Sequence, residues 1–122
     1  MSTLVDTSVL IGAGQPSNIE MDGGWAVSAI TIGELEAGVL LTEDPTRRAS
    51  RLRRLAAVFA EAPTLGIDRA VAARYGELRA KTGRLPTNDL WIAATALAHD
   101  LTLLTADERQ AALPLVRVSR IP

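Results

Sequence analysis

The chain has 122 residues, a length that suits one domain, and 48% of them are hydrophobic, which excludes a disordered tail. It contains no cysteine, so disulfides and zinc–thiolate sites are excluded, a composition that fits a reducing cytoplasm. The net charge of −1 conceals a segregation, because residues 1–46 carry seven acids and no Lys or Arg, whereas residues 47–84 carry ten basic residues and three acids. This division suits a metal site beside a phosphate-binding surface, although a solvated Arg-rich helix explains the basic segment equally well.

Short apolar runs alternate with helical patterns along the chain. We expect strands over 2–5, 25–30, 63–67, 101–105 and 115–118. We expect a loop over 14–24 and helices over 7–14, 31–41, 69–83, 89–99 and 107–113, with a further helix that starts at Asp44-Pro45. Strands that alternate with helices predict a parallel sheet covered on both faces, here in a single domain over 1–122. No apolar run approaches the roughly 20 residues that span a bilayer, and the N-terminus has no basic segment typical of a signal peptide.

Four carboxylates stand where apolar sequence gives way to a helical pattern. Asp6, Glu34 and Asp107 follow strand-like runs, directly or within a few residues, and Asp89 opens a helix of its own. In an open α/β sheet, the carboxyl ends of the strands form the rim that holds the functional crevice. Four acids gathered there repel one another unless a divalent cation lies between them. A site made only of oxygen ligands predicts Mg²⁺ or Mn²⁺.

Each acid also has a structural explanation. Asp6 is a good helix N-cap, and Glu34 follows Thr31 by three residues, the spacing of a capping box. Asp89 falls in a first helical turn and gains from the helix dipole, while Asp107 precedes a glutamine by three residues. The two explanations are compatible, because a helix N-terminus lowers the pKa of a carboxylate and keeps it ionised for metal binding.

The surrounding residues narrow the chemistry. The hydroxyls of Thr7, Ser8 and Thr105 lie next to the acids and are placed either to hold carboxylates by hydrogen bonds or to form local turns. The sequence has no phosphate-binding glycine loop, no dinucleotide fingerprint, no nucleophile elbow and no Cys–His pair. What remains is hydrolysis in which metal ions supply the acid–base chemistry.

The segments DTSVLI, ITIGELEAGV, NDLWIAATAL and LLTADE resemble, in this order, the motifs of the PIN domain, and most of all those of VapC-type toxins of type II toxin–antitoxin pairs. The resemblance runs over nearly the whole chain. It implies a Mg²⁺- or Mn²⁺-dependent endoribonuclease with a three-layer α/β/α fold around a five-stranded parallel sheet. It also implies that the catalytic and metal-binding acids are Asp6, Glu34, Asp89 and Asp107, with Thr105 matching a threonine that often precedes the last acid.

The resemblance further implies an RNA substrate, a VapB-type antitoxin whose C-terminal segment lies across the active-site groove, and a homodimer. Residues 47–54 and 69–84 are the candidates for contact with the RNA backbone. On the helix expected over 31–41, Val39, Leu40 and Leu41 offer more apolar surface than one core face needs, which suits an interface, although burial explains them nearly as well.

One departure and several alternatives remain open. Relatives often carry a D-x-D-F pattern where this chain has Asp107-Glu108-Arg109-Gln110, which leaves open whether Glu108 assists Asp107. A catalytically degenerate binding module and a DNA nuclease of the same fold are alternatives to a ribonuclease. A receiver-like phosphotransfer domain fits poorly, because Ser8 stands where a second acid is needed and the only lysine is Lys81 in mid-chain.

Overall fold

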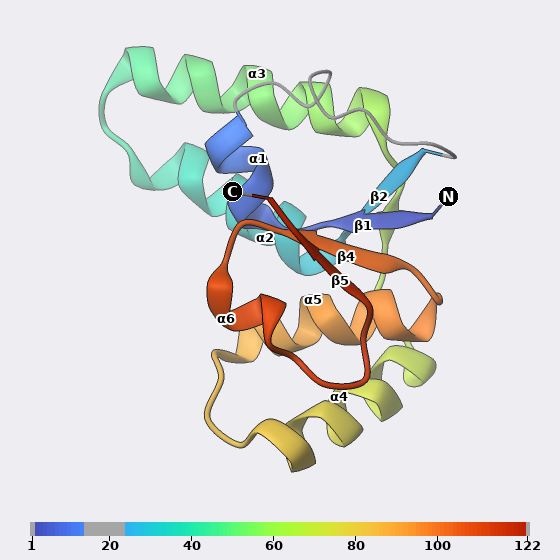
Figure 1. The fold of residues 1–122 in the computed structure, drawn as a ribbon. Helices are drawn as coiled ribbons and strands as arrows, with labels where there is room; N and C mark the ends of the chain where they lie inside the picture. Colours follow the sequence, from blue (N-terminus) through green and yellow to red (C-terminus); the bar gives the residue numbers. More distant parts are fainter. Residues whose placement is uncertain (1, 14–23, 122) are drawn as a thin grey trace.

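A five-stranded sheet forms the centre of the molecule in a computed structural model that describes residues 2–13 and 24–121 (Figure 1). Its strands lie in the order β3-β2-β1-β4-β5, and every neighbouring pair is parallel. The strands are β1 (Thr3–Val5), β2 (Trp25–Ser28), β3 (Thr64–Leu65), β4 (Thr102–Thr105) and β5 (Val118–Arg120). The parallel sheet expected from the sequence is thereby confirmed. Apart from Gly24, the loop expected over 14–24 lies outside the described residues.

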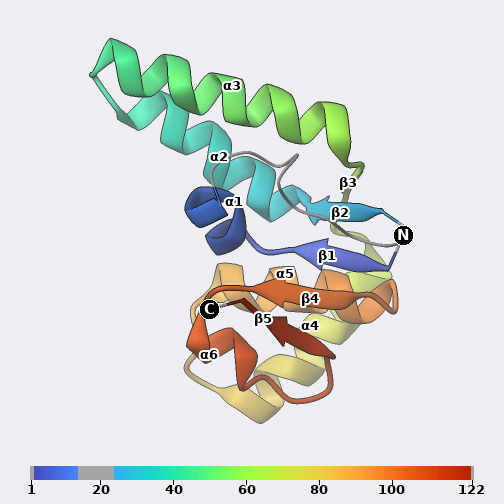
Figure 2. The ribbon, with the colours of Figure 1, turned by 45° about the horizontal axis from the view of Figure 1, so that its top comes forward.

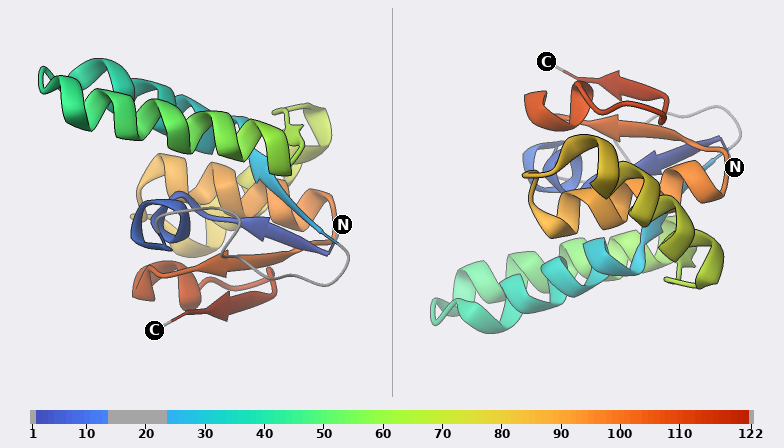
Figure 3. Two further views of the ribbon diagram at one scale, coloured as in Figure 1. Left: turned by 90° about the horizontal axis from the view of Figure 1, so that it is seen from above. Right: turned by 90° about the horizontal axis from the view of Figure 1, so that it is seen from below.

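Helices cover both faces of this sheet. They are α1 (Thr7–Ala13), α2 (Ala29–Leu41), α3 (Pro45–Glu61), α4 (Arg69–Thr82), α5 (Thr87–Ala98) and α6 (Glu108–Ala111). The α2–α3 hairpin projects at the β2–β3 edge of the sheet, while β5 forms the opposite edge (Figure 2). Seen from below, α4 lies outside α5, against which it packs (Figure 3). None of the helices in the described part of the chain is long and apolar enough to cross a membrane.

Two apolar cores lie on opposite sides of the sheet because successive strand residues point to opposite faces. In β1, Leu4 belongs to the core under α4 and α5, whereas Val5 belongs to the core under α1, α2 and α3. In β2, Ala26 joins the first core and Val27 the second. The three-layer α/β/α arrangement expected from the resemblance is therefore confirmed.

The start of α2 differs from the expectation. The strand before it ends at Ser28 rather than at residue 30, and Ser28 is the N-cap, because its hydroxyl accepts a hydrogen bond from the Ile30 N–H at 3.1 Å. Thr31 consequently lies inside the helix and is fully buried. The capping box proposed for Thr31 and Glu34 was wrong, since Glu34 lies in the second turn of α2 rather than at its start.

Other differences concern caps, faces and strand ends. The helix expected over 89–99 begins two residues earlier, because α5 starts directly after Pro86, without a side-chain cap. The last strand begins at Val118 rather than at residue 115, since Leu115 adopts a positive φ of 71°, a left-handed backbone that a strand cannot contain. On α3, Val58 is buried in the core, whereas Phe59 and Leu52 are exposed.

The sheet topology fixes where a site can form. From β1 the chain builds β2 and β3 on one side and then returns to build β4 and β5 on the other, so the strand order reverses between β1 and β4. Ligands of open α/β sheets bind at such a switch point, outside the carboxyl ends of the strands. At this edge lie α1, α6 and the start of α5 (Figure 2).

Candidate active site

Asp6 follows β1 directly at the switch point and is only 3% exposed. Its Oδ2 accepts hydrogen bonds from the Ser8 N–H at 3.2 Å, the Ser8 hydroxyl at 2.5 Å and the Thr105 hydroxyl at 3.1 Å. The bond from the Ser8 N–H satisfies a backbone donor in the first turn of α1, so Asp6 also serves as a cap. The expectation that Ser8 and Thr105 hold a carboxylate is confirmed, and this buried carboxylate has a fixed orientation.

Glu34 is brought to the same edge by α2. The hydroxyl of Thr7 donates to Glu34 Oε1 at 2.8 Å, and the Thr31 hydroxyl lies 3.0 Å from that of Thr7. Thr7 directly follows Asp6 in the chain, so this bond places the Glu34 carboxylate beside the loop that carries Asp6. Glu36, two residues further along α2, is exposed.

Asp107 caps α6 after β4. It accepts hydrogen bonds from the backbone N–H of Arg109 at 2.8 Å and from the Arg109 guanidinium at 3.3 Å. Desolvation alone would raise the pKa of Asp107, but the hydrogen bonds and the positive charge of Arg109 outweigh it and lower this pKa. Glu108 instead lies 3.8 Å from the Arg120 guanidinium, in an ion pair with β5.

Asp89, in the first turn of α5, lies within electrostatic range of Asp6, Glu34 and Asp107. Burial raises the pKa of Asp89 to about 6, the negative charges of Asp6, Asp107 and Glu34 add to this shift, and the positive charge of Arg109 opposes it. The expectation that a helix N-terminus keeps the pKa of this carboxylate low was wrong, because burial and three like charges outweigh the dipole.

These four acids, which we call the acid cluster, come from four separate segments and lie near enough to one another that the charges of Asp6, Asp107 and Glu34 raise the pKa of Asp89. Among residues 2–13 and 24–121, no three acidic or histidine side chains converge closely enough to form a ready-made metal site. The donor set is nonetheless chemically suited to one, since it consists of carboxylate and hydroxyl oxygens, the ligands that hard divalent cations prefer.

The sequence analysis missed one residue of this region as part of the site. Gln110 is only 1% exposed, and its side-chain amide lies against Asp6 and Thr105. It entered the sequence analysis only through its spacing from Asp107. A glutamine in a short polar segment carries no signal of burial, so only the packing of α6 against the sheet edge reveals it.

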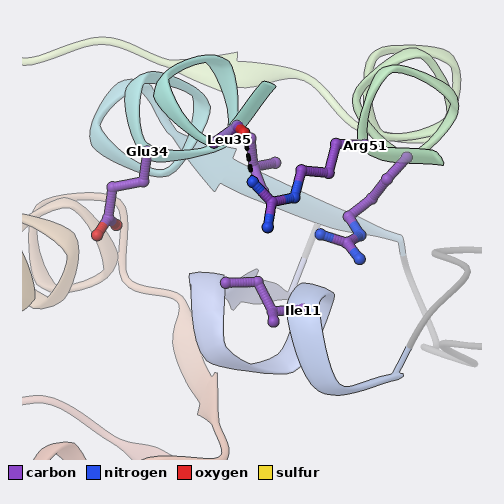
Figure 4. Close-up of a pocket in the computed structure, with 6 residues that line it drawn as sticks. Ile11, Glu34, Leu35 and Arg51 are labelled. Carbon is purple, nitrogen blue, oxygen red and sulfur yellow. Dashed lines mark hydrogen bonds between the residues drawn. The ribbon is translucent and has the colours of Figure 1, made fainter. Parts of the chain in front are cut away.

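A pocket of about 200 Å³ adjoins the acid cluster between α1, α2 and α3. We call it the basic pocket; its lining comprises Ile11, Glu34, Leu35, Gly38, Arg51 and Arg54. Arg51 reaches from α3 to donate to the Gly38 carbonyl at 2.6 Å, while the Glu34 carboxylate extends away from the Arg51 guanidinium (Figure 4). Glu34 therefore belongs to both the pocket and the acid cluster.

The fold and the acid cluster together define an α/β protein with a carboxylate site at the switch point of a parallel sheet. Comparison with known proteins identifies the family to which the chain belongs. The sequence pattern of the PIN domain matches residues 3–115. The chain is 43% identical over 128 residues to Ribonuclease VapC4 of Mycobacterium tuberculosis, covering 97% of this chain and 95% of that one. It is 36% identical over 117 residues to Ribonuclease VapC5 of the same organism, covering 90% and 86%.

The solved structures agree with the sequence comparison. The crystal structure of VapBC-5 from Mycobacterium tuberculosis, a member of the VapBC family of toxin–antitoxin systems, superposes with a TM-score of 0.84 at 35% identity, covering 98% of each chain. The chain therefore belongs to the PIN domain family, and within it to the VapC-type ribonuclease toxins of VapBC toxin–antitoxin systems.

Proposed function

We propose that this chain, working as a single domain, hydrolyses RNA phosphodiester bonds at the acid cluster with Mg²⁺ or Mn²⁺ as cofactor. The observation that carries the proposal is the electrostatic coupling of Asp89 to Asp6, Asp107 and Glu34 at the switch point. Mutual repulsion of this kind makes a cluster of carboxylates a favourable place for a divalent cation. The family to which the chain belongs is known to use divalent metal.

The four acids have different tasks in this proposal. Asp6 and Asp89 hold the principal cation, and Asp6 is prepared for this by the donors that fix its orientation. Glu34 and Asp107 complete the site or orient the attacking water, from which a carboxylate accepts a proton. When bound, the cation activates water and offsets the negative charge that develops on the phosphate.

The basic pocket supports RNA as the substrate. Arg51 and Arg54 line it from α3, and Glu34 links it to the acid cluster, so a phosphate backbone lying over the arginines reaches the acids. Contacts of this kind position a strand without reading its sequence. The basic helix α4 packs against α5 instead, and its Arg74 is paired with Glu77. We therefore assign the backbone contact to α3 before α4.

A matched pair of variants tests the catalytic proposal. Asp6→Asn should lower RNA cleavage by about a hundredfold to a thousandfold, the scale on which removal of a group that stabilises transition-state charge acts, and should abolish Mg²⁺ binding in calorimetry. Glu36→Gln removes one acid from the exposed face of α2 and should leave both properties unchanged. Because Asp6 also caps α1, melting curves must show that the Asn variant remains folded. Full cleavage by a folded Asp6→Asn variant would reject the assignment.

We also propose that a VapB-type antitoxin inhibits the chain by covering the basic pocket and the acid cluster. Solved structures similar to this chain are toxin–antitoxin complexes, including that of VapBC-5. The exposed apolar side chains around the α2–α3 hairpin, Leu40, Leu41 and Leu52, provide the surface for such a partner. Val39, which we had grouped with Leu40 and Leu41, is buried in the core and is not available.

A homodimer and a cytoplasmic location complete the proposal. Dimerisation rests on the family resemblance, and sedimentation velocity of the chain alone tests it, since a monomer at every concentration would contradict it. A cytoplasmic location follows from the proposed substrate, because RNA and newly made antitoxin are both available there.

A further inference from the structure

We propose that the Gln110 side-chain amide positions the Asp6 carboxylate and leaves Asp6 Oδ1 as the oxygen that would be available to a cation. This inference rests on the proposed function, because it assumes that Asp6 is a metal ligand. Gln110 belongs to the short helix α6, yet its side chain is almost completely buried at the switch point. A buried amide must be hydrogen-bonded, so its contacts define what it does.

The amide can present either its oxygen or its nitrogen to Asp6. With the oxygen on that side, it accepts from the Thr105 hydroxyl at 2.9 Å but lies within hydrogen-bonding distance of both Asp6 carboxylate oxygens and repels them. The nitrogen then donates only to the Asp89 carbonyl at 3.3 Å, a long bond that the opposite orientation gives up. With the nitrogen on that side, it donates to Asp6 Oδ2 at 3.0 Å, to Asp6 Oδ1 at 3.1 Å and to the Thr105 hydroxyl at 2.9 Å. Hydrogen bonds to an ionised carboxylate are about twice as strong as neutral ones, so the nitrogen faces Asp6.

The two oxygens of Asp6 are then unequally engaged. Oδ2 is surrounded by the Ser8 N–H, the Ser8 hydroxyl, the Thr105 hydroxyl and the Gln110 amide. A carboxylate oxygen offers about two lone-pair directions, so Oδ2 is saturated. Among the described residues, Oδ1 receives only the Gln110 amide and keeps a lone pair for a cation. Gln110 spans both oxygens and thereby prevents the carboxylate from rotating about its own axis.

Gln110 is thus a positioning residue that acts through Asp6. Groups that orient a metal ligand typically change metal affinity or activity by about 10–100-fold when they are removed. Gln110→Met keeps the length of the side chain and removes its donor. We expect this variant to bind Mg²⁺ at least tenfold more weakly in calorimetry, and we expect its RNA cleavage to recover when Mg²⁺ is raised to saturation.

The control is Leu113→Met, a conservative change at a buried apolar position three residues further along the chain. It should leave both Mg²⁺ affinity and cleavage unchanged. Melting curves in the absence of Mg²⁺ separate positioning from simple damage to the core, because a loosened core lowers the Tm even without cation, whereas loss of positioning does not. Wild-type Mg²⁺ affinity in a folded Gln110→Met variant would overturn the inference.

A second measurement on the wild-type chain does not depend on the folding of any variant. In ¹⁵N-correlated NMR spectra, the side-chain amide signals of Gln110 should shift on addition of Mg²⁺ and broaden on addition of Mn²⁺. Unmoved signals would overturn the inference even if Gln110→Met failed to fold. The two variants also separate this inference from the proposed function. If Asp6→Asn loses Mg²⁺ binding but Gln110→Met binds Mg²⁺ normally, only the role of Gln110 is refuted. If Asp6→Asn binds Mg²⁺ normally, the proposed function itself is refuted.

Discussion

Among residues 2–13 and 24–121, Asp89 is the one whose ionisation is most affected by its surroundings. Its pKa of about 6 arises first from burial and then from the charges of Asp6, Asp107 and Glu34. Between pH 4 and pH 6 the folded chain therefore binds more protons at this site than the unfolded chain, and the free energy of unfolding falls as the pH rises through that window. The same repulsion that weakens the fold above pH 6 favours the binding of a cation.

Asp89→Asn should therefore stabilise the metal-free chain at pH 8 and have little effect below pH 4. A pKa shift of this size corresponds to a change of about 3 kcal/mol in the free energy of unfolding. Because the carboxyl is partly exposed, we expect a gain of about 1 kcal/mol, which raises the Tm by about 3–4 °C. Melting curves in a chelating buffer at several pH values measure it. Glu36→Gln, a change at an exposed acid on α2, should show no such gain. A lower Tm for Asp89→Asn at pH 8 would contradict the expected repulsion.

At the scale of elements, the sequence predicted which segments are helices and strands better than it predicted where they begin. The alternation of apolar runs was enough to predict the parallel sheet, while the joint action of the four acids in one metal site stays a prediction. The start of α2 was missed because Ser28 competes with Thr31 as a cap, and the hydrogen bond that decides between them exists only in the folded backbone. The apolar face of α3 is equally hard to predict, because one helical turn offers both Val58 and Phe59 to the core, and only packing selects Val58.

The helix α3 carries a prediction of its own. Replacing Arg51 and Arg54 together by Ala should weaken binding of all single-stranded RNAs to a similar extent and make its salt dependence shallower. The slope of the logarithm of the binding constant against the logarithm of the salt concentration should become shallower by about 1.4 if both arginines contact phosphates, since each contact contributes about 0.7 for a single strand. Arg53→Ala removes an exposed charge between them that does not line the basic pocket, and should change the slope little. Binding titrations from low to high salt measure this, and an unchanged slope in the double variant would count against the pocket as the RNA site.

At the scale of the whole molecule, the topology separates the acid cluster from the exposed leucines at the end of α2, although Glu34 and Leu40 are only six residues apart in the sequence. The acid cluster lies at the switch point, while the end of α2 carries Leu40 and Leu41 away from it on a projecting hairpin (Figure 1). These two leucines are 77% and 80% exposed, so they contribute little to the core. A partner that contacts the hairpin and reaches the basic pocket would inhibit the chain without any change in its fold.

Replacing both Leu40 and Leu41 by Ser should therefore weaken antitoxin binding while leaving RNA cleavage and Tm unchanged. Loss of apolar contact at one buried leucine costs about 1.4 kcal/mol or more, so the Kd for the cognate antitoxin should rise at least tenfold. Inhibition of RNA cleavage by increasing antitoxin measures this in one assay, because cleavage without antitoxin serves as the internal control. Leu115→Ser exposes a hydroxyl in place of an apolar side chain near β5, away from the hairpin, and should leave inhibition intact. If the double variant is inhibited at the same antitoxin concentrations as the wild type, the antitoxin does not bind the hairpin. Weakened inhibition would show that the antitoxin contacts the hairpin while it blocks RNA cleavage at the acid cluster.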